Sequence, residues 1–104
     1  MASSKEYLYF ISEQLSGLDE IAFKPMMGEF LLYYRGRLVG GIYDDRLLVK
    51  PVKSAIEYMQ NVSYTPPYDG AKEMLLVVNV DDKEYLCSLF EAMFDDLPTP
   101  KNRR

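Results

Sequence analysis

The sequence predicts an α+β domain in which an antiparallel sheet of about five strands carries helices on one face. Residues 29–50 contain three β-rich segments separated by two short turn signals, a pattern typical of an antiparallel meander. Segments with helical spacing of apolar residues lie on either side of this meander. The expected order of elements is therefore α-β-β-β-β-α-β-α, in a single domain over residues 1–100.

The N-terminal segment predicts the first helix. Ser3 or Ser4 supplies its N-cap, and Ser3 stands at capping-box spacing from Glu6. The apolar stripe of this helix consists of Leu8, Ile11, Leu15 and Leu18. Gly17 is expected to end the helix, because glycine adopts a left-handed conformation without a steric penalty.

Four strands are expected next. Ile21 and Phe23 alternate toward Pro25, and a strand that contains proline belongs at the edge of a sheet. The meander that follows has its strands over Glu29–Tyr34, Arg37–Tyr43 and Arg46–Lys50. Arg35-Gly36 and Asp44-Asp45 form the turns, and we expect a positive φ at the glycine because a tight hairpin requires it.

The second half of the chain predicts a helix, a loop and a strand. Pro51 ends the meander and suits the first turn of a helix. The apolar stripe of that helix consists of Val52, Ile56 and Met59. Residues 61–70 predict a loop, and with only two prolines the loop interpretation of Pro66-Pro67 is favoured over a polyproline ligand. Glu73–Val80 is the expected fifth strand.

The last helix has the clearest amphipathic pattern in the chain. Asp81 or Asp82 caps its N-terminus, and Pro98 ends it. Its apolar stripe consists of Leu86, Leu89, Phe90, Met93 and Leu97. Residues 101–104 form a short basic tail, which we expect to be disordered.

Composition favours a soluble cytoplasmic protein that does not bind nucleic acid. Sixteen acidic residues outnumber twelve basic ones, giving a net charge of −4, whereas nucleic-acid binders concentrate positive charge. A single cysteine excludes an intrachain disulfide and favours a reducing compartment. The N-terminal segment lacks the features of a signal peptide, and no apolar run approaches the length of a membrane span.

The sequence offers little for catalysis. It contains no histidine, the commonest general base and metal ligand. Cys87 is interpreted as a small semi-buried hydrophobe, and the paired aspartates as turn and helix-end residues rather than metal ligands. Gly40-Gly41 falls mid-strand and marks a bulge or the close approach of another chain. Lys50, at the end of a strand before Pro51, is interpreted as a solvated strand end. We therefore expect no enzyme, no metal and no cofactor.

The segment from Met27 to Lys50 resembles the N-terminal domain of the TfoX/Sxy family of competence regulators. That family shows a glycine-aromatic start, a tyrosine, a glycine turn, a glycine in the next strand, an aspartate turn and a strand that ends in lysine. The residues that fit in register are Gly28, Phe30, Tyr33, Gly36, Gly40, Asp44, Leu47 and Lys50. This match implies that Lys50 is a weak candidate site residue. The chain departs from the family at Glu29 and Leu31, where further glycines are frequent.

The resemblance implies a fold similar to that of secretion chaperones and a stand-alone form of the domain, without the C-terminal helical domain of the longer regulators. It also implies a bacterial regulatory module that binds a protein of the transcription machinery, or itself as a homodimer, rather than DNA. An enzyme with an unrecognised carboxylate or lysine site is the alternative.

Counting outward by twos from the two predicted turns assigns the strands to two faces. The face expected under the helices holds Leu31, Tyr33, Leu38, Gly40, Ile42, Leu47 and Val49. The other face is expected to bind protein through Phe30, Leu32, Tyr34, Arg37, Tyr43, Arg46, Leu48 and Lys50, and it also holds Val39 and Gly41. A helix that crosses over to cover this second face, or a bulge at Gly40-Gly41 that changes the phase, is the alternative.

Overall fold

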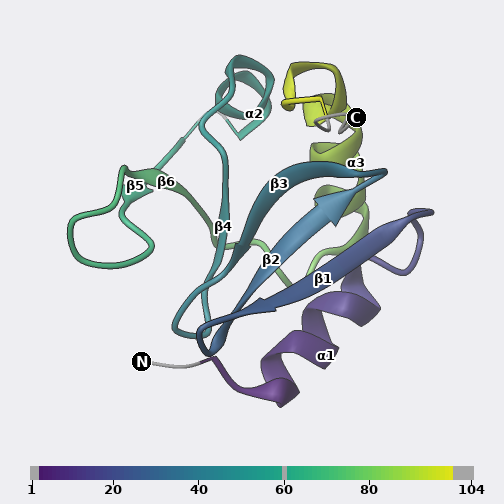
Figure 1. Ribbon diagram of the computed structural model, residues 1–104. Helices are drawn as coiled ribbons and strands as arrows, with labels where there is room; N and C mark the ends of the chain where they lie inside the picture. Colours follow the sequence, from purple (N-terminus) through teal and green to yellow (C-terminus); the bar gives the residue numbers. More distant parts are fainter. Residues whose placement is uncertain (1–2, 60, 100–104) are drawn as a thin grey trace, which may run out of the picture.

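The computed structural model describes residues 3–59 and 61–99, and it confirms the α+β prediction (Figure 1). The helices are α1 (Lys5–Gln14), α2 (Lys53–Met59), α3 (Lys83–Met93) and a 3₁₀ turn, η1 (Phe94–Asp96). The strands are β1 (Ile21–Met26), β2 (Glu29–Tyr34), β3 (Arg37–Ile42), β4 (Leu47–Val49), β5 (Tyr64–Thr65) and β6 (Met74–Val77). The predicted basic tail, residues 101–104, lies outside the described residues.

The strands form one antiparallel sheet in the order β1-β2-β3-β4-β6-β5 (Figure 1). The described part of the chain therefore contributes six strands where the sequence predicted about five. The additional strand is β5, which lies inside the expected loop and pairs Tyr64 with Leu75. The backbone N–H of Leu76 extends this pairing by donating to the carbonyl of Ser63 at 2.9 Å.

Three two-residue hairpin turns hold β1 to β4 together. Both central residues have positive φ in each turn, as type I′ hairpins require: 52° and 87° at Met27-Gly28, 53° and 84° at Arg35-Gly36, and 54° and 55° at Asp44-Asp45. The predicted positive φ at Gly36 is thus confirmed. The expected closing pairs are also confirmed, since Tyr34 faces Arg37 and Tyr43 exchanges two backbone hydrogen bonds with Arg46.

A β-bulge in β3 changes which side chains face the helices. Leu32 pairs with Gly40 but Tyr33 pairs with Leu38, so Val39 is an extra residue with no partner in β2. An extra residue reverses the alternation of side chains beyond it. The sequence had left open a bulge at Gly40-Gly41 as an alternative. The structure confirms a bulge, one residue earlier in the chain.

The core lies between one face of the sheet and the helices. The sheet contributes Leu32, Tyr34, Val39, Ile42, Leu47, Val49, Leu75 and Val77 to this buried cluster. The helices and their ends contribute Ile11, Leu15, Ala55, Leu86, Leu89, Phe90, Met93 and Leu97. All five residues of the stripe predicted for the last helix are buried, although Leu97 follows η1 and lies outside α3, and α1, α2 and α3 all pack against this same cluster.

The helix ends differ in part from those predicted by the sequence. Ser4, not Ser3, caps α1 by accepting from the N–H of Tyr7 at 3.1 Å, whereas the Ser3 hydroxyl donates to the Glu29 carboxylate. Asp82 caps α3 in the same way. Helix α1 ends at Gln14, before Gly17, and Glu20 adopts the left-handed conformation with φ of 62°.

Strand β1 forms one edge of the sheet, as Pro25 predicted. Arg35 donates its backbone N–H to the carbonyl of Glu20 at 2.9 Å, so alternate residues from Glu20 onward bond to β2. The main-chain polar groups of Ile21, Phe23 and Pro25 therefore point outward from the edge.

Within residues 3–59 and 61–99, no helix has the length and apolar character needed to cross a bilayer.

Candidate functional site

The candidate site lies on the face of the sheet opposite the helices, here called the open face. The described side chains assigned to it by the strand pairing are Leu31, Tyr33, Leu38, Tyr43, Arg46, Leu48, Lys50, Met74 and Leu76. Residues 66–73, here called the β5–β6 loop, cover part of this face. In Figure 1 this loop lies at the end of the sheet far from β1.

The predicted contact residues divide between the two faces. Phe30, Leu32, Tyr34 and Arg37 point toward the helices, so their assignment to the open face was wrong. Leu32 is fully buried, and the ring of Tyr34 lies 5.5 Å from that of Phe94. The physical reason is the bulge at Val39. Its extra residue means that side chains counted from the first turn and side chains counted from the second turn alternate onto opposite faces of the sheet.

Arg37 is fixed by the last helical turn. Its guanidinium lies 4.2 Å from the centre of the Phe94 ring and donates to the Phe94 carbonyl at 2.9 Å. This combination of a cation–π contact and a hydrogen bond makes Arg37 part of the packing between β3 and η1. The same correction applies in reverse to Leu31, Tyr33 and Leu38, which were expected under the helices and lie on the open face.

Tyr43, Arg46, Leu48 and Lys50 lie on the open face, as predicted. Arg46 is a structural anchor, because its guanidinium donates to the carbonyls of Tyr43 and Pro67 and to the hydroxyl of Thr65. These bonds hold the β5–β6 loop against the hairpin between β3 and β4. Leu48 is completely buried although it lies outside the main core.

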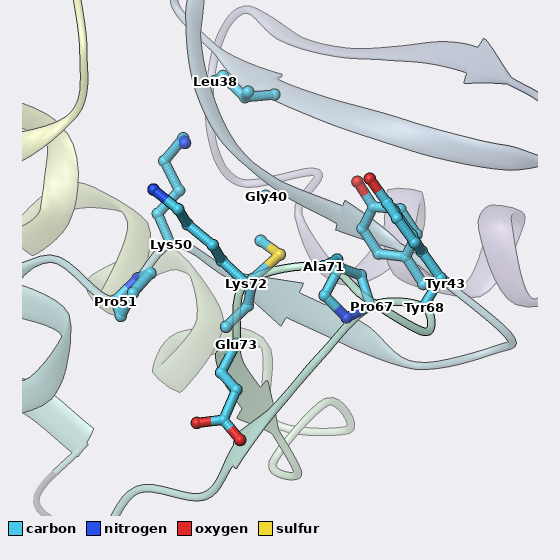
Figure 2. Close-up of a pocket in the computed structure, with 11 residues that line it drawn as sticks. Leu38, Gly40, Tyr43, Lys50, Pro51, Pro67, Tyr68, Ala71, Lys72 and Glu73 are labelled. Carbon is cyan, nitrogen blue, oxygen red and sulfur yellow. The ribbon is translucent and has the colours of Figure 1, made fainter.

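The β5–β6 loop and the open face enclose a hollow of about 300 Å³ (Figure 2). The lining residues are Leu38, Gly40, Tyr43, Lys50, Pro51, Pro67, Tyr68, Ala71, Lys72, Glu73 and Met74. Figure 2 shows Tyr43 and Tyr68 side by side at one end, and their ring centres are 6.3 Å apart. The side chains of Lys50 and Lys72 extend toward the other end, while Glu73 points away from them.

The two ends of the hollow differ in charge: one holds neutral tyrosines and the other holds two lysines. Burial raises the pKa of Tyr43, and the nearby Tyr68, Glu29 and Tyr33 raise it further, so this phenol remains protonated and able to donate. At the other end, neither Lys50 nor Lys72 forms an ion pair with any residue that the structure describes. Two cations thus line the same hollow as the apolar side chains of Leu38, Met74 and Ala71.

The β5–β6 loop supplies half of the hollow, and none of its residues was among the predicted site residues. Pro67 and Tyr68 fall within the predicted loop over residues 61–70, and Lys72 lies between that loop and the predicted strand Glu73–Val80. One signal was present, because the segment from Thr65 to Gly70 combines prolines with an aromatic residue, and binding residues are disproportionately found on loops. Their position over Lys50 depends on β6 pairing with β4, which the sequence pattern does not specify.

The remaining reactive groups have structural surroundings. Cys87 points its sulfur at the carbonyl of Gln14 at 3.9 Å, and burial raises the pKa of the thiol, which disfavours the nucleophilic thiolate. Asp45 accepts from the backbone N–H of Ser4 at 2.8 Å and so ties the start of α1 to the second turn of the meander. Across residues 3–59 and 61–99, His, Cys, Asp and Glu side chains form no group of three placed to hold a metal ion.

Comparison with known proteins gives one relative. No family model matches the chain, and no solved structure matches it. A protein of Spirochaeta aurantia, described as an uncharacterized 12.7 kDa protein in the trpE 5′ region, is 30% identical over 105 aligned positions. The alignment covers all of this chain and 91% of the relative. The chain therefore belongs to the same protein family as this spirochaetal protein.

Proposed function

We propose that the protein is a regulatory module that acts by binding another protein through the open face of its sheet. The carrying observation is that this face keeps half-buried apolar side chains beside the hollow, namely Leu31, Tyr33, Leu38, Met74 and Leu76. Tyr68, which projects from the β5–β6 loop at its border, is 60% exposed. Tyrosines and apolar side chains around a concavity are typical of protein-contact surfaces.

The anchoring of the β5–β6 loop supports the proposal. Arg46, itself bonded to the carbonyl of Tyr43, fixes the loop before any partner arrives through its hydrogen bonds to Thr65 and Pro67. A preformed surface loses less conformational entropy on binding than a mobile one. The face is therefore organised for recognition and is not merely the outside of a sheet.

The proposed class of partner comes from the resemblance of residues 27–50 to the N-terminal domain of TfoX/Sxy competence regulators. On that basis the partner is a protein of the bacterial transcription machinery, and the module works in the cytoplasm. Alternatively, the open face binds a second copy of the chain. The experiment below distinguishes this homodimer from a complex with another protein.

The test compares two open-face variants, Tyr33→Asp and Leu38→Asp, with the wild-type protein. Light scattering measures the oligomeric state, and capture from an extract of the native host followed by mass spectrometry identifies partners. Tyr9→Asp is the matched control, because Tyr9 is a 65% exposed aromatic on α1, away from the open face. Circular dichroism establishes that each variant is folded.

We expect both open-face variants to lose a captured transcription protein, or to lose self-association, while the control retains it. If both variants are folded and keep their partners and their oligomeric state, the open face is not the binding surface. Loss of partners in the control alone would place the interface on α1 and also contradict the proposal.

A second candidate function, an enzyme that uses Lys50, is favoured by one observation. Lys50 and Lys72 line the same hollow, and a neighbouring cation is one means by which proteins activate a lysine amine. Borohydride reduction in the presence of pyruvate would trap a Schiff base as a mass increase on Lys50. The absence of the adduct in wild-type protein, judged against a known Schiff-base aldolase in parallel, would remove this candidate.

A further inference from the structure

We propose that the hollow recognises a single carboxylate on the partner, presented by a glutamate side chain within an extended apolar segment. The inference rests on the proposed function and specifies the chemistry of the partner. Its starting point is the contrast between the whole chain, with a net charge of −4, and the hollow, where two lysines have no described ion-pair partner.

The two lysines converge from different elements. Lys50 follows β4 and is half-buried, and Lys72 projects from the β5–β6 loop just before β6. Figure 2 shows both side chains extending toward the same end of the hollow, near Leu38. A carboxylate placed between them accepts hydrogen bonds from both ammonium groups, and charged hydrogen bonds of this kind are stronger than neutral ones.

The apolar part of the lining favours a carboxylate on an aliphatic stem. Leu38, Ala71 and Met74 line the same hollow as the lysines and offer apolar surface within it. Methylene groups of a glutamate side chain bury against this surface, and the reduced exposure to water strengthens the attraction between the charges. A small hydrated anion has no methylene groups to bury, so it would gain only the attraction between the charges.

The neighbouring groove argues against a polyanion such as a nucleic acid. Glu29, Asp44 and Asp69 line that groove, which shares Pro67 and Tyr68 with the hollow. A chain of phosphates leaving the lysines in this direction would meet three carboxylates and one cation, Arg46, so its charges would be repelled on balance, whereas a peptide with one acidic residue brings no further negative charge to this groove. Charge complementarity therefore selects an isolated negative charge.

The tyrosine end of the hollow provides the second part of the recognition. Tyr43 and Tyr68 present their rings side by side, and Figure 2 shows both hydroxyl groups directed to the same side. An extended segment whose glutamate lies between the lysines has its neighbouring residues over these rings. Aromatic side chains supply large contact areas with little loss of conformational entropy.

The experiment is a ¹⁵N–¹H NMR titration of the whole chain with two capped tripeptides, acetyl-Leu-Glu-Leu-amide and acetyl-Leu-Gln-Leu-amide. We expect the glutamate peptide to cause saturable shifts of the Leu38, Gly40 and Lys50 amide signals. The glutamine peptide should bind at least about fivefold more weakly, which corresponds to roughly 1 kcal/mol for a partly exposed ion pair.

Variants that remove one positive charge each show which lysines bind the glutamate peptide. Lys50→Gln and Lys72→Gln should each weaken binding of the glutamate peptide about fivefold, by the same arithmetic. Lys53→Gln is the control, because Lys53 lies on the exposed side of α2 and pairs with Glu57 at 4.0 Å. Retained dispersion of the NMR spectrum shows that each variant is folded.

The outcomes separate the two proposals. Equal binding of the two peptides at the same amides would overturn the carboxylate inference and leave open-face binding intact. No saturable shift up to about 10 mM, a concentration above that of weak but specific binding, would also overturn the inference. The proposed function fails only when the folded Tyr33→Asp and Leu38→Asp variants keep both their partners and their oligomeric state.

Discussion

Gly40 and Leu48 lie in contact, with no room for a side chain between them. A Cβ atom on Gly40 would stand 2.0 Å from the carbonyl oxygen of Leu48 and 2.7 Å from the Cα of Val49. The neighbouring strand is main chain at this point and does not move as a flexible side chain would. The β-bulge of β3 is therefore compatible with glycine alone at this position.

Gly40→Ala should consequently lower the free energy of unfolding by about 3 kcal/mol, the upper part of the usual range for overpacking in a rigid environment. Urea denaturation followed by circular dichroism measures the change. Gly17→Ala is the control, because its Cβ would meet only the sulfur of Cys87 at 3.4 Å. A Gly40→Ala protein as stable as wild type would show that the bulge is misplaced.

Gly36 tests the first turn of the meander. Its φ of 84° lies in the left-handed region, where a β-branched residue is strained. Gly36→Val should cost about 1–2 kcal/mol, and Gly36→Asn distinctly less because asparagine tolerates this conformation. Thermal unfolding of the three proteins measures the order. Equal melting temperatures for the valine and asparagine variants would contradict the turn geometry.

Arg46 tests the anchoring of the β5–β6 loop. Arg46→Met keeps the aliphatic stem but removes the donors to Tyr43, Thr65 and Pro67. We expect amide hydrogen exchange to accelerate across residues 68–73, with a loss of about 1 kcal/mol in global stability. Arg35→Met is the control, since Arg35 lies over Phe94 at the other end of the strands. Unchanged exchange in the loop would show that Arg46 does not hold it.

The raised pKa of Tyr43 predicts that the stability of the folded protein declines at alkaline pH. Its pKa is raised in the folded protein, chiefly by burial, so the folded state holds this proton more tightly than the unfolded state does. The resulting stabilisation is complete below the unfolded pKa of about 10 and is lost as the pH rises through the folded value. Tyr43→Phe should therefore flatten the decline of stability above about pH 10.

Urea denaturation between pH 8 and 11 measures this dependence. Tyr9→Phe is the matched control, because Tyr9 is a tyrosine that is 65% exposed. Burial also raises the pKa values of Tyr7 and Tyr85, so part of the decline should persist in Tyr43→Phe. An identical pH dependence in Tyr43→Phe and wild type would contradict the role assigned to this phenol.

Local signals predicted most of the fold. Both turns of the meander were found because hairpins of this length need residues that accept positive φ, and Gly36 and the Asp44-Asp45 pair do so. The stripe of the last helix was found because its spacing is regular. Strand β5 was missed because two residues, Tyr64 and Thr65, carry no periodicity of their own and become a strand only by pairing with β6.

The site was predicted only in part, and the bulge is the reason. Tyr34 and Tyr43 each precede a two-residue turn, yet Val39 places them on opposite faces of the sheet. A rule that counts by twos has no means of detecting one extra residue. Lys50 was included as a weak candidate, whereas Lys72 reaches the same hollow only through the order of strands β4, β6 and β5.

Pro25 has a further consequence for how the molecule behaves at high concentration. It occupies an outward-pointing position of β1 and carries no N–H, so the exposed edge offers donors only at Ile21 and Phe23. Lys24, between Phe23 and Pro25, adds an exposed charge. A strand from another molecule cannot continue its ladder past this point, which disfavours fibril growth from this edge. The sheet can thus keep apolar side chains on its open face without inviting strand-by-strand aggregation at β1.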